Sequence, residues 1–305
     1  MSAEVSVLFD APGPKARFRH TVAAAVGGLA IAFLLFLLIR ALAAKDQFTA
    51  AKWSPFADPV TWTSYLLPGL RATLVAAFFA IILSVVCGIL LGMGRLSQLR
   101  GVRWACGTFV EFFRSVPVLM MMLFAFYVFL FGFQISGDLL PLYGVVAGLT
   151  FYNSSVIAEL IRSGVGSLPN GQREAGLAIG LTPFQTLRTV LLPQAITLML
   201  PSIVSQLVVV LKDSALGFLI QYPELIRSGQ TLASLRGNLI PTFIVIAVVF
   251  IVINYLLTLL ARYLERRLQA SRRGPKAPPA DPMLNPALAP AIGTTGAPAE
   301  GSKAA

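Results

Sequence analysis

The sequence predicts an all-α membrane protein with about six transmembrane helices, and three observations lead to that fold class. Six long stretches carry no charged residue. The chain is 56% hydrophobic and only 12% charged, with a mean hydropathy of +0.78, whereas a soluble domain is typically about 25% charged. The net charge of +11 lies mainly in loops and tails beside the apolar stretches. That placement indicates membrane topology rather than nucleic-acid binding.

Each charge-free stretch has the length of a membrane-spanning helix. A hydrocarbon core of about 30 Å needs roughly 20 apolar residues. The six stretches are residues 21–39, 72–94, 115–137, 139–158, 189–211 and 237–261. We expect one transmembrane helix from each.

The first stretch follows a basic segment. We interpret residues 1–20 as a cytoplasmic N-terminal segment and residues 21–44 as an additional first transmembrane helix. Ala41-Leu42-Ala43 is similar to a signal-peptidase site, so a cleaved signal peptide is the alternative. We favour a retained anchor, because signal peptides have apolar regions of only about 7–15 residues.

Lysines and arginines near the spans predict the orientation. With the N-terminus inside, fifteen of them fall on the cytoplasmic side and six on the other. Positive charges concentrate on the cytoplasmic side of membrane proteins. Both termini, and the polar loop between the fourth and fifth spans, are therefore expected in the cytoplasm.

That polar loop, Ser167–Ala195, contains the signals of two short helices. The first is expected over Gly171–Ile179, and Gly180 can end it in the left-handed conformation. The second begins with a capping box formed by Thr182 and Gln185, with a proline at its first position. The first helix has two charged residues and an otherwise small surface, formed by Arg173, Glu174, Ala175, Gly176 and Ala178. Such a helix can enter a groove on another protein.

The loop resembles the cytoplasmic coupling motif of ABC-importer permeases, most closely that of the polar amino acid uptake family. The resemblance lies in Gly171-Gln172-Arg173-Glu174-Ala175, Gly180 and Leu192-Pro193-Gln194-Ala195. In that family the motif begins Glu-Ala-Ala, but Gly176 replaces the second alanine here. The glycine should loosen the helix by about 1 kcal/mol. The alternative is an ordinary polar loop, which does not account for the spacing.

The resemblance implies a type I ABC-importer permease bundle over residues 66–268 in the bacterial plasma membrane. It implies ATP-binding cassette ATPase subunits, a second permease subunit (identical or different) and an extracytoplasmic amino acid-binding protein as partners. Overall similarity to bacterial glutamate permeases favours glutamate or aspartate as the substrate. An ion- or proton-coupled secondary transporter is the alternative, although we find no internal repeat in the sequence.

No enzymatic site is expected. The sequence lacks the Gly-x-x-x-x-Gly-Lys-Ser/Thr phosphate loop, so we expect ATP to be hydrolysed on a partner subunit. It also lacks a nucleophile–base pair for a membrane enzyme, and we expect no catalytic residue, cofactor or metal. Cys87 and Cys106 are interpreted as inert thiols, and the Pro-, Ala- and Gly-rich residues 269–305 as a disordered cytoplasmic tail.

Glu111 and Arg114 precede the third apolar stretch and are three residues apart, so a helix would place them on one face. They can pair with each other, and we favour a structural ion pair over the alternative, a contact with the substrate. Pro117 should bend the chain. The segment resembles the Glu-Phe-Phe-Arg-x-x-Pro signature of the same family.

Asn153 lies among polar residues at membrane depth in the fourth stretch. Two interpretations are open: it lines a cavity, or it forms a hydrogen bond between helices.

Lys212, Asp213 and Ser214 form the most conspicuous polar group within the apolar sequence, because they follow 23 charge-free residues. A charge at that depth costs about 2.5–3.5 kcal/mol on insertion scales. A zwitterionic amino acid could supply a carboxylate to Lys212 and an ammonium to Asp213. The motif resembles the family's Leu-Lys-Asp-x-Ser-Leu; the alternative is a polar anchor at the outer gate. The candidate substrate-binding residues are Lys212, Asp213, Ser214, Asn153, Arg114 and Glu111.

Overall fold

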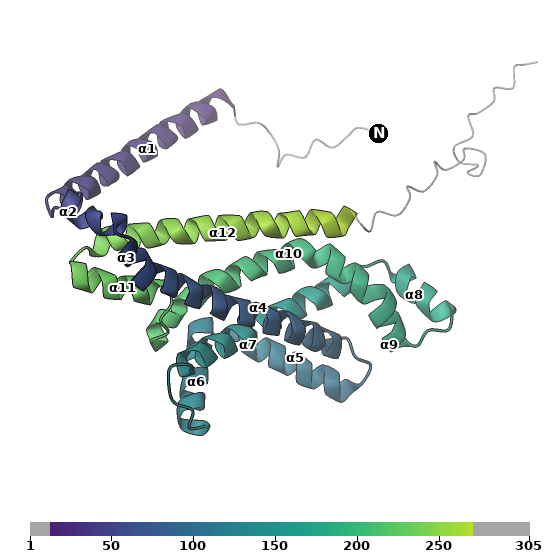
Figure 1. Ribbon diagram of the computed structural model, residues 1–305. Coiled ribbons are helices and arrows are strands. Elements are labelled where there is room, and N and C mark those ends of the chain that lie inside the picture. The colour runs from purple at the N-terminus through teal and green to yellow at the C-terminus, as the bar shows by residue number, and fades with distance from the viewer. Residues whose placement is uncertain (1–12, 271–305) are drawn as a thin grey trace, which may run out of the picture.

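A computed structural model describes residues 13–270, which are almost entirely helical and contain no strand. The helices, in chain order, are α1 (Pro14–Ala43), α2 (Ala50–Trp53), η2 (Ser54–Ala57), α3 (Pro59–Thr61), η3 (Trp62–Leu66), α4 (Leu67–Arg95), α5 (Arg100–Ser115), α6 (Val118–Tyr127), η4 (Val128–Gly132), α7 (Leu140–Gly166), α8 (Asn170–Ala178), α9 (Pro183–Thr186), η5 (Leu187–Leu191), α10 (Leu192–Asp213), η6 (Ser214–Ile220), α11 (Leu225–Arg236) and α12 (Leu239–Ala270). The predicted all-α fold class is confirmed (Figure 1).

Five continuous helical segments are long and apolar enough to cross a membrane: Lys15–Ala43, Pro59–Arg95, Leu140–Gly166, Pro183–Ile220 and Leu239–Tyr263. The sixth predicted span, residues 115–137, is not one straight helix. Arg100–Ser115 and Val118–Gly132 meet at an angle of 105° and count as one broken span. The break follows from Pro117, because Val116 before it takes an extended conformation, as a residue preceding proline tends to do. The predicted bend at Pro117 is confirmed.

Helix α7 is the centre of the bundle, and α4, α6 and α10 pack against it. Small residues allow α4 and α7 to approach closely. A Cβ added at Gly88 of α4 would lie 2.7 Å from the Cβ of Ile157 on α7, so only glycine fits there. The buried core beside this contact includes Ile157, Ile161 and Leu192.

Helix α1 diverges from the bundle (Figure 1), and none of its apolar residues is buried against the rest of the chain. It begins at Pro14, within the segment predicted to precede the first span. At the other end of the chain, α12 continues to Ala270, two residues into the predicted tail. Residues 271–305 of that tail lie outside the described residues.

Candidate functional site

The loop between α7 and α10 has the local structure that its sequence predicts. Helix α8 occupies Asn170–Ala178, and Gly180 follows it with φ = +86°. Thr182 and Gln185 form the expected capping box: the Thr182 N–H donates to Oε1 of Gln185 at 2.8 Å, and the Gln185 N–H donates to Oγ1 of Thr182 at 3.3 Å. These contacts fix α9 and η5 after the turn, so α8 and α9 project together from one end of the bundle (Figure 1).

Gly176 has a structural role that the sequence did not reveal. It is the buried residue of α8, and it faces Thr186 of α9. A Cβ at this position would lie 2.6 Å from Cγ2 and 3.0 Å from Oγ1 of Thr186. The second alanine of the Glu-Ala-Ala pattern would therefore not fit, because α8 and α9 are packed too closely.

The opposite side of α8 is exposed. Arg173 and Glu174 are on the surface, and so are the apolar side chains of Leu177 and Ile179. Oε1 of Gln172 accepts a hydrogen bond of 3.2 Å from Nε2 of Gln194, which connects α8 directly to α10. A force applied to α8 can therefore reach α10, through this contact and through η5.

Five charged side chains meet where α4, α5 and α7 come together near this end of the bundle. Glu159 of α7 is their centre: its Oε2 is 2.7 Å from Nη1 of Arg95 and 3.6 Å from Nη1 of Arg114, and its Oε1 is 2.5 Å from Nη2 of Arg162. Arg95 also binds Glu111, with Nη2 at 2.8 Å from Oε1. Arg95 is only 13% exposed and Glu159 22%, so these charges are partly shielded from solvent. We call this group the Glu159 network.

The expected pairing of Glu111 with Arg114 is wrong. Glu111 instead binds Arg95 of α4, and Arg114 turns towards Glu159. The sequence spacing identified one helix face correctly, but stronger partners lie on the neighbouring helices. Glu111 is also 63% exposed and does not line the cavity described next.

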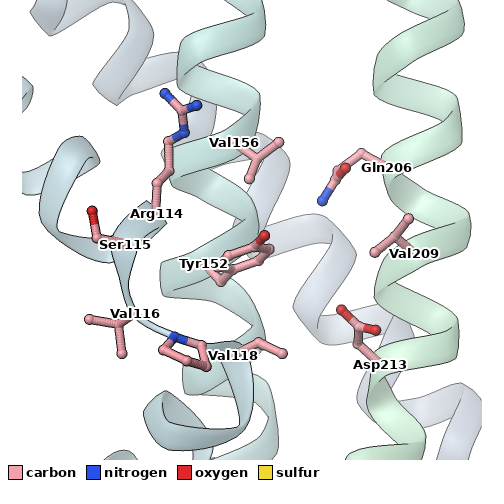
Figure 2. A pocket seen from close by; sticks show the side chains of 10 residues that line it. Arg114, Ser115, Val116, Val118, Tyr152, Val156, Gln206, Val209 and Asp213 are labelled. Atoms are coloured by element: carbon pink, nitrogen blue, oxygen red, sulfur yellow. The ribbon is translucent and has the colours of Figure 1, made fainter.

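A polar cavity of about 370 Å³ lies between the α5–α6 break, α7 and α10 (Figure 2). Its lining residues are Arg114, Ser115, Val116, Pro117, Val118, Tyr152, Val156, Gln206, Val209 and Asp213. A cation, Arg114, and an anion, Asp213, thus face the same space, and Figure 2 shows the Tyr152 side chain between them. The cavity can therefore hold a small molecule that carries charges of both signs.

The candidate substrate residues are distributed unevenly around this cavity. Arg114 and Asp213 line it. Lys212 lines a different cavity on the other side of α10, because successive residues of a helix point about 100° apart. The structure thus corrects the expectation that one ligand meets both Lys212 and Asp213. Ser214 is buried, and its hydroxyl donates to the Leu211 carbonyl at 2.7 Å. Its side chain therefore bonds to the backbone near the end of α10 and does not line the cavity.

Asn153 is fully buried behind the cavity wall. Its Oδ1 accepts a hydrogen bond of 2.7 Å from Nε2 of Gln206 on α10, and its Nδ2 donates to the Leu149 carbonyl at 2.7 Å. Asn153 had two possible roles, lining a cavity or forming a hydrogen bond between helices, and the structure shows the hydrogen bond. Gln206 and Tyr152 were missed as cavity residues, although a glutamine within a charge-free span is a signal that could have identified one of them.

Metal binding has no structural support in this part of the chain: residues 13–270 contain no group of three or more His, Cys, Asp or Glu side chains that could hold a metal ion.

Comparisons with known proteins agree with this architecture. Residues 84–270 match the family described as "Binding-protein-dependent transport system inner membrane component". The chain is similar to the glutamate transport system permease protein GluD of Corynebacterium glutamicum, with 48% identity over 210 residues covering 69% of this chain and 77% of that protein. It is 31% identical to the glutamate/aspartate import permease protein GltK of Escherichia coli O157:H7 over 192 residues, 61% of this chain and 85% of that protein.

Solved structures show the same fold. A crystal structure of an amino acid ABC transporter with histidines superposes with a TM-score of 0.61 at 27% identity, covering 68% of this chain and 96% of that chain. An inward-facing form of the MetNI methionine ABC transporter gives a TM-score of 0.55 at 23% identity, covering 69% and 98%.

Proposed function

The chain belongs to the binding-protein-dependent transport system inner membrane components, and from that membership we propose that it is a permease subunit of an ATP-driven importer of polar amino acids. The observation that carries the proposal is α8, a short exposed helix fixed to the bundle through Gly176 and Gln172. No phosphate loop occurs in the sequence, so the ATPase is a separate subunit and α8 is its docking helix. The permease itself has no catalytic residue and uses no cofactor.

Docking of the ATPase at α8 couples ATP hydrolysis to transport. Closure of the ATPase subunits displaces α8, and the movement passes to α10, whose far end carries Asp213. The residues we assign to this coupling are Gly171, Gln172, Arg173, Glu174, Ala175, Ala178, Gly180, Leu192 and Pro193. Leu192 is buried at the start of α10, where it transmits the movement by packing rather than by direct contact with the ATPase.

The cavity between Arg114 and Asp213 is the proposed substrate site. An amino acid places its ammonium group at Asp213 and a carboxylate at Arg114, while Tyr152 and Gln206 offer neutral polar contacts. The names of the relatives in Corynebacterium glutamicum and Escherichia coli favour glutamate or aspartate as the substrate. This assignment replaces Lys212 with Arg114 as the partner of the carboxylate.

Arg114 also approaches Glu159, at 3.6 Å. A substrate carboxylate would therefore compete with Glu159 for Arg114. Because α7 runs from Glu159 to the residues just before α8, occupancy of the cavity can influence the docking end of the permease.

The assembly we propose contains a second permease chain, two ATPase subunits and an extracytoplasmic amino acid-binding protein. The excess of positive charge at the α8 end of the spans supports a cytoplasmic location for that end and for both termini.

Affinity purification in mild detergent tests the function. We expect an ATPase subunit to co-purify with the tagged chain and Glu174→Ala to uncouple ATP hydrolysis from uptake. Recovery of an autonomous, ion-driven transporter would support a secondary carrier instead.

Two substitutions test the substrate site. Arg114→Gln and Asp213→Ala should each abolish uptake of radiolabelled glutamate in proteoliposomes while leaving ATPase co-purification intact. Arg103→Gln is the matched control, because Arg103 is an exposed arginine of the same helix that lies outside the cavity. Unchanged uptake by Asp213→Ala would remove Asp213 from the site.

A further inference from the structure

A second cavity lies on the opposite side of α10 from the proposed substrate site. Its volume is about 540 Å³, and it is lined by Lys212, Ala215, Ile226, Phe250, Ile251 and Asn254. The residues come from α10, η6, α11 and α12. Most of this lining is apolar, so the two polar residues in it require an explanation.

Neither polar residue is satisfied within the part of the chain that the structure describes. Over residues 13–270, the Lys212 ammonium has no ion pair or hydrogen bond. Asn254 donates from Nδ2 to the Phe250 carbonyl at 2.7 Å, but its buried Oδ1 accepts no hydrogen bond. A buried acceptor without a donor costs about 1–3 kcal/mol. Lys212 is exposed on the surface of this single chain, and even if it turned to donate to Asn254 it would still have no ion-pair partner among the described residues.

The position of Asn254 along α12 argues against a lipid headgroup as its missing partner. Asn254 is fifteen residues after Leu239, where α12 begins, which corresponds to about 22 Å along the helix. It is nine residues before Tyr263, where the candidate span ends, or about 13 Å from that end. Because the hydrocarbon core is about 30 Å thick, Asn254 and the Lys212 beside it lie in its interior.

No carboxylate of the described residues forms an ion pair with Lys212. Asp213, the nearest carboxylate in sequence, lines the other cavity. Glu159 is bound by three arginines at the α8 end of the bundle. An uncompensated charge in the hydrocarbon interior normally faces a bundle or pairs with another group, and a helix of another chain at the same depth could supply that group.

We infer that the face formed by Lys212, Asn254 and Ile251 is the docking surface for a transmembrane helix of the second permease chain. That helix carries a carboxylate opposite Lys212 and an N–H or O–H donor opposite Asn254. The apolar side chains of Phe250 and Ile251 supply the packing surface around this polar contact. The inference rests on the proposed function only for the existence of a second permease chain.

The test is co-purification from the intact membrane with the tagged full-length chain. The second permease chain is quantified against the tagged chain, and the ATPase is quantified in the same sample. Breaking one partner of a buried ion pair is strongly destabilising, so Lys212→Met should lower recovery of the second permease chain about tenfold or more. Lys212→Arg keeps the charge and should retain it.

A second variant guards against misfolding. Asn254→Leu removes the unsatisfied oxygen, so the tagged chain alone should remain monodisperse in gel filtration, yet it should retain less of the second permease chain. Wild-type recovery of that chain by Lys212→Met, or its absence from the wild-type sample, overturns the inference. Because the ATPase binds at α8, its recovery reports separately on the proposed function.

Discussion

The contact between Gly176 and Thr186 gives a quantitative prediction for the docking helix. In Gly176→Ala the new Cβ would lie 2.6 Å from Cγ2, 3.0 Å from Oγ1 and 3.3 Å from Cβ of Thr186. Rotating Thr186 about χ1 would not remove the clash. In every staggered rotamer either Cγ2 or Oγ1 stays close to the new Cβ, and the Thr186 Cβ does not move. Overpacking of this kind costs about 1–3 kcal/mol, and the higher helix propensity of alanine returns about 1 kcal/mol.

Thr186→Ala should relieve the clash. The Thr186 hydroxyl is buried and has no hydrogen-bond partner, so removing it costs little. In the double variant only the gain in helix propensity remains, and we expect a coupling energy between the two substitutions of about 1–3 kcal/mol. Gly171→Ala is the matched control: it lies near the start of the same helix, and nothing is within 4 Å of its added Cβ, so it should stabilise α8 by at most about 1 kcal/mol.

Hydrogen exchange of the backbone amides of residues 175–178 in the detergent-purified chain measures these differences. Exchange should be faster in Gly176→Ala than in Gly171→Ala, and Thr186→Ala should restore protection to the Gly176 variant. Equal protection by the two glycine substitutions, with additive effects of Thr186→Ala, would refute the reasoning. ATP-driven uptake should fall in Gly176→Ala and recover in the double variant with Thr186→Ala, because α8 must keep its position to transmit the movement of the ATPase.

Three further predictions concern other parts of the chain. Pro117→Ala removes a helix-breaking cost of about 3 kcal/mol, so α5 and α6 should straighten and uptake should fall; spin-label distances across the 105° bend would show the change. Burial raises the pKa of Glu224 to about 7, so the folded state keeps a proton that the unfolded chain loses near pH 4.5. The stability of α11 should therefore decrease as the pH rises from about 4.5 to 7, by up to about 3 kcal/mol, and Glu224→Gln should remove this dependence in unfolding measured by hydrogen exchange. Arg95→Gln removes two ion pairs of Glu111 and Glu159 and should lower thermal stability, whereas Arg103→Gln should leave the melting temperature unchanged.

Local sequence signals predicted the local structure well. Gly180 and the Thr182–Gln185 box determined where α8 ends and α9 begins, because both act through backbone geometry and short-range hydrogen bonds. Pro117 predicted a bend for the same reason. Hydrophobic length predicted five spans as continuous helical segments, and it failed for residues 115–137, because apolar composition does not show where a helix is interrupted.

Contacts between distant segments could not be predicted. Glu111 and Arg114 share a helix face, but their partners are on α4 and α7, and no spacing rule within one helix identifies them. Lys212 and Asp213 drew attention as a pair, yet a helix necessarily separates adjacent side chains, and the packing of α12 decided which cavity each one faces. The sequence predicted only that Gly176 loosens α8. The close packing of Thr186 of α9 against this glycine could not be predicted.

The break between α5 and α6 has a consequence for water. The start of α6 has no side-chain cap, and residues 115–118 form part of the cavity wall. Carbonyl and amide groups left open in this way would each cost several kcal/mol in hydrocarbon, and they are tolerated at membrane depth where they line a water-filled space. We therefore expect the cavity to hold water before cargo enters, so that cargo displaces water. A water-filled chamber of this kind has to be closed at its ends to prevent ion leakage.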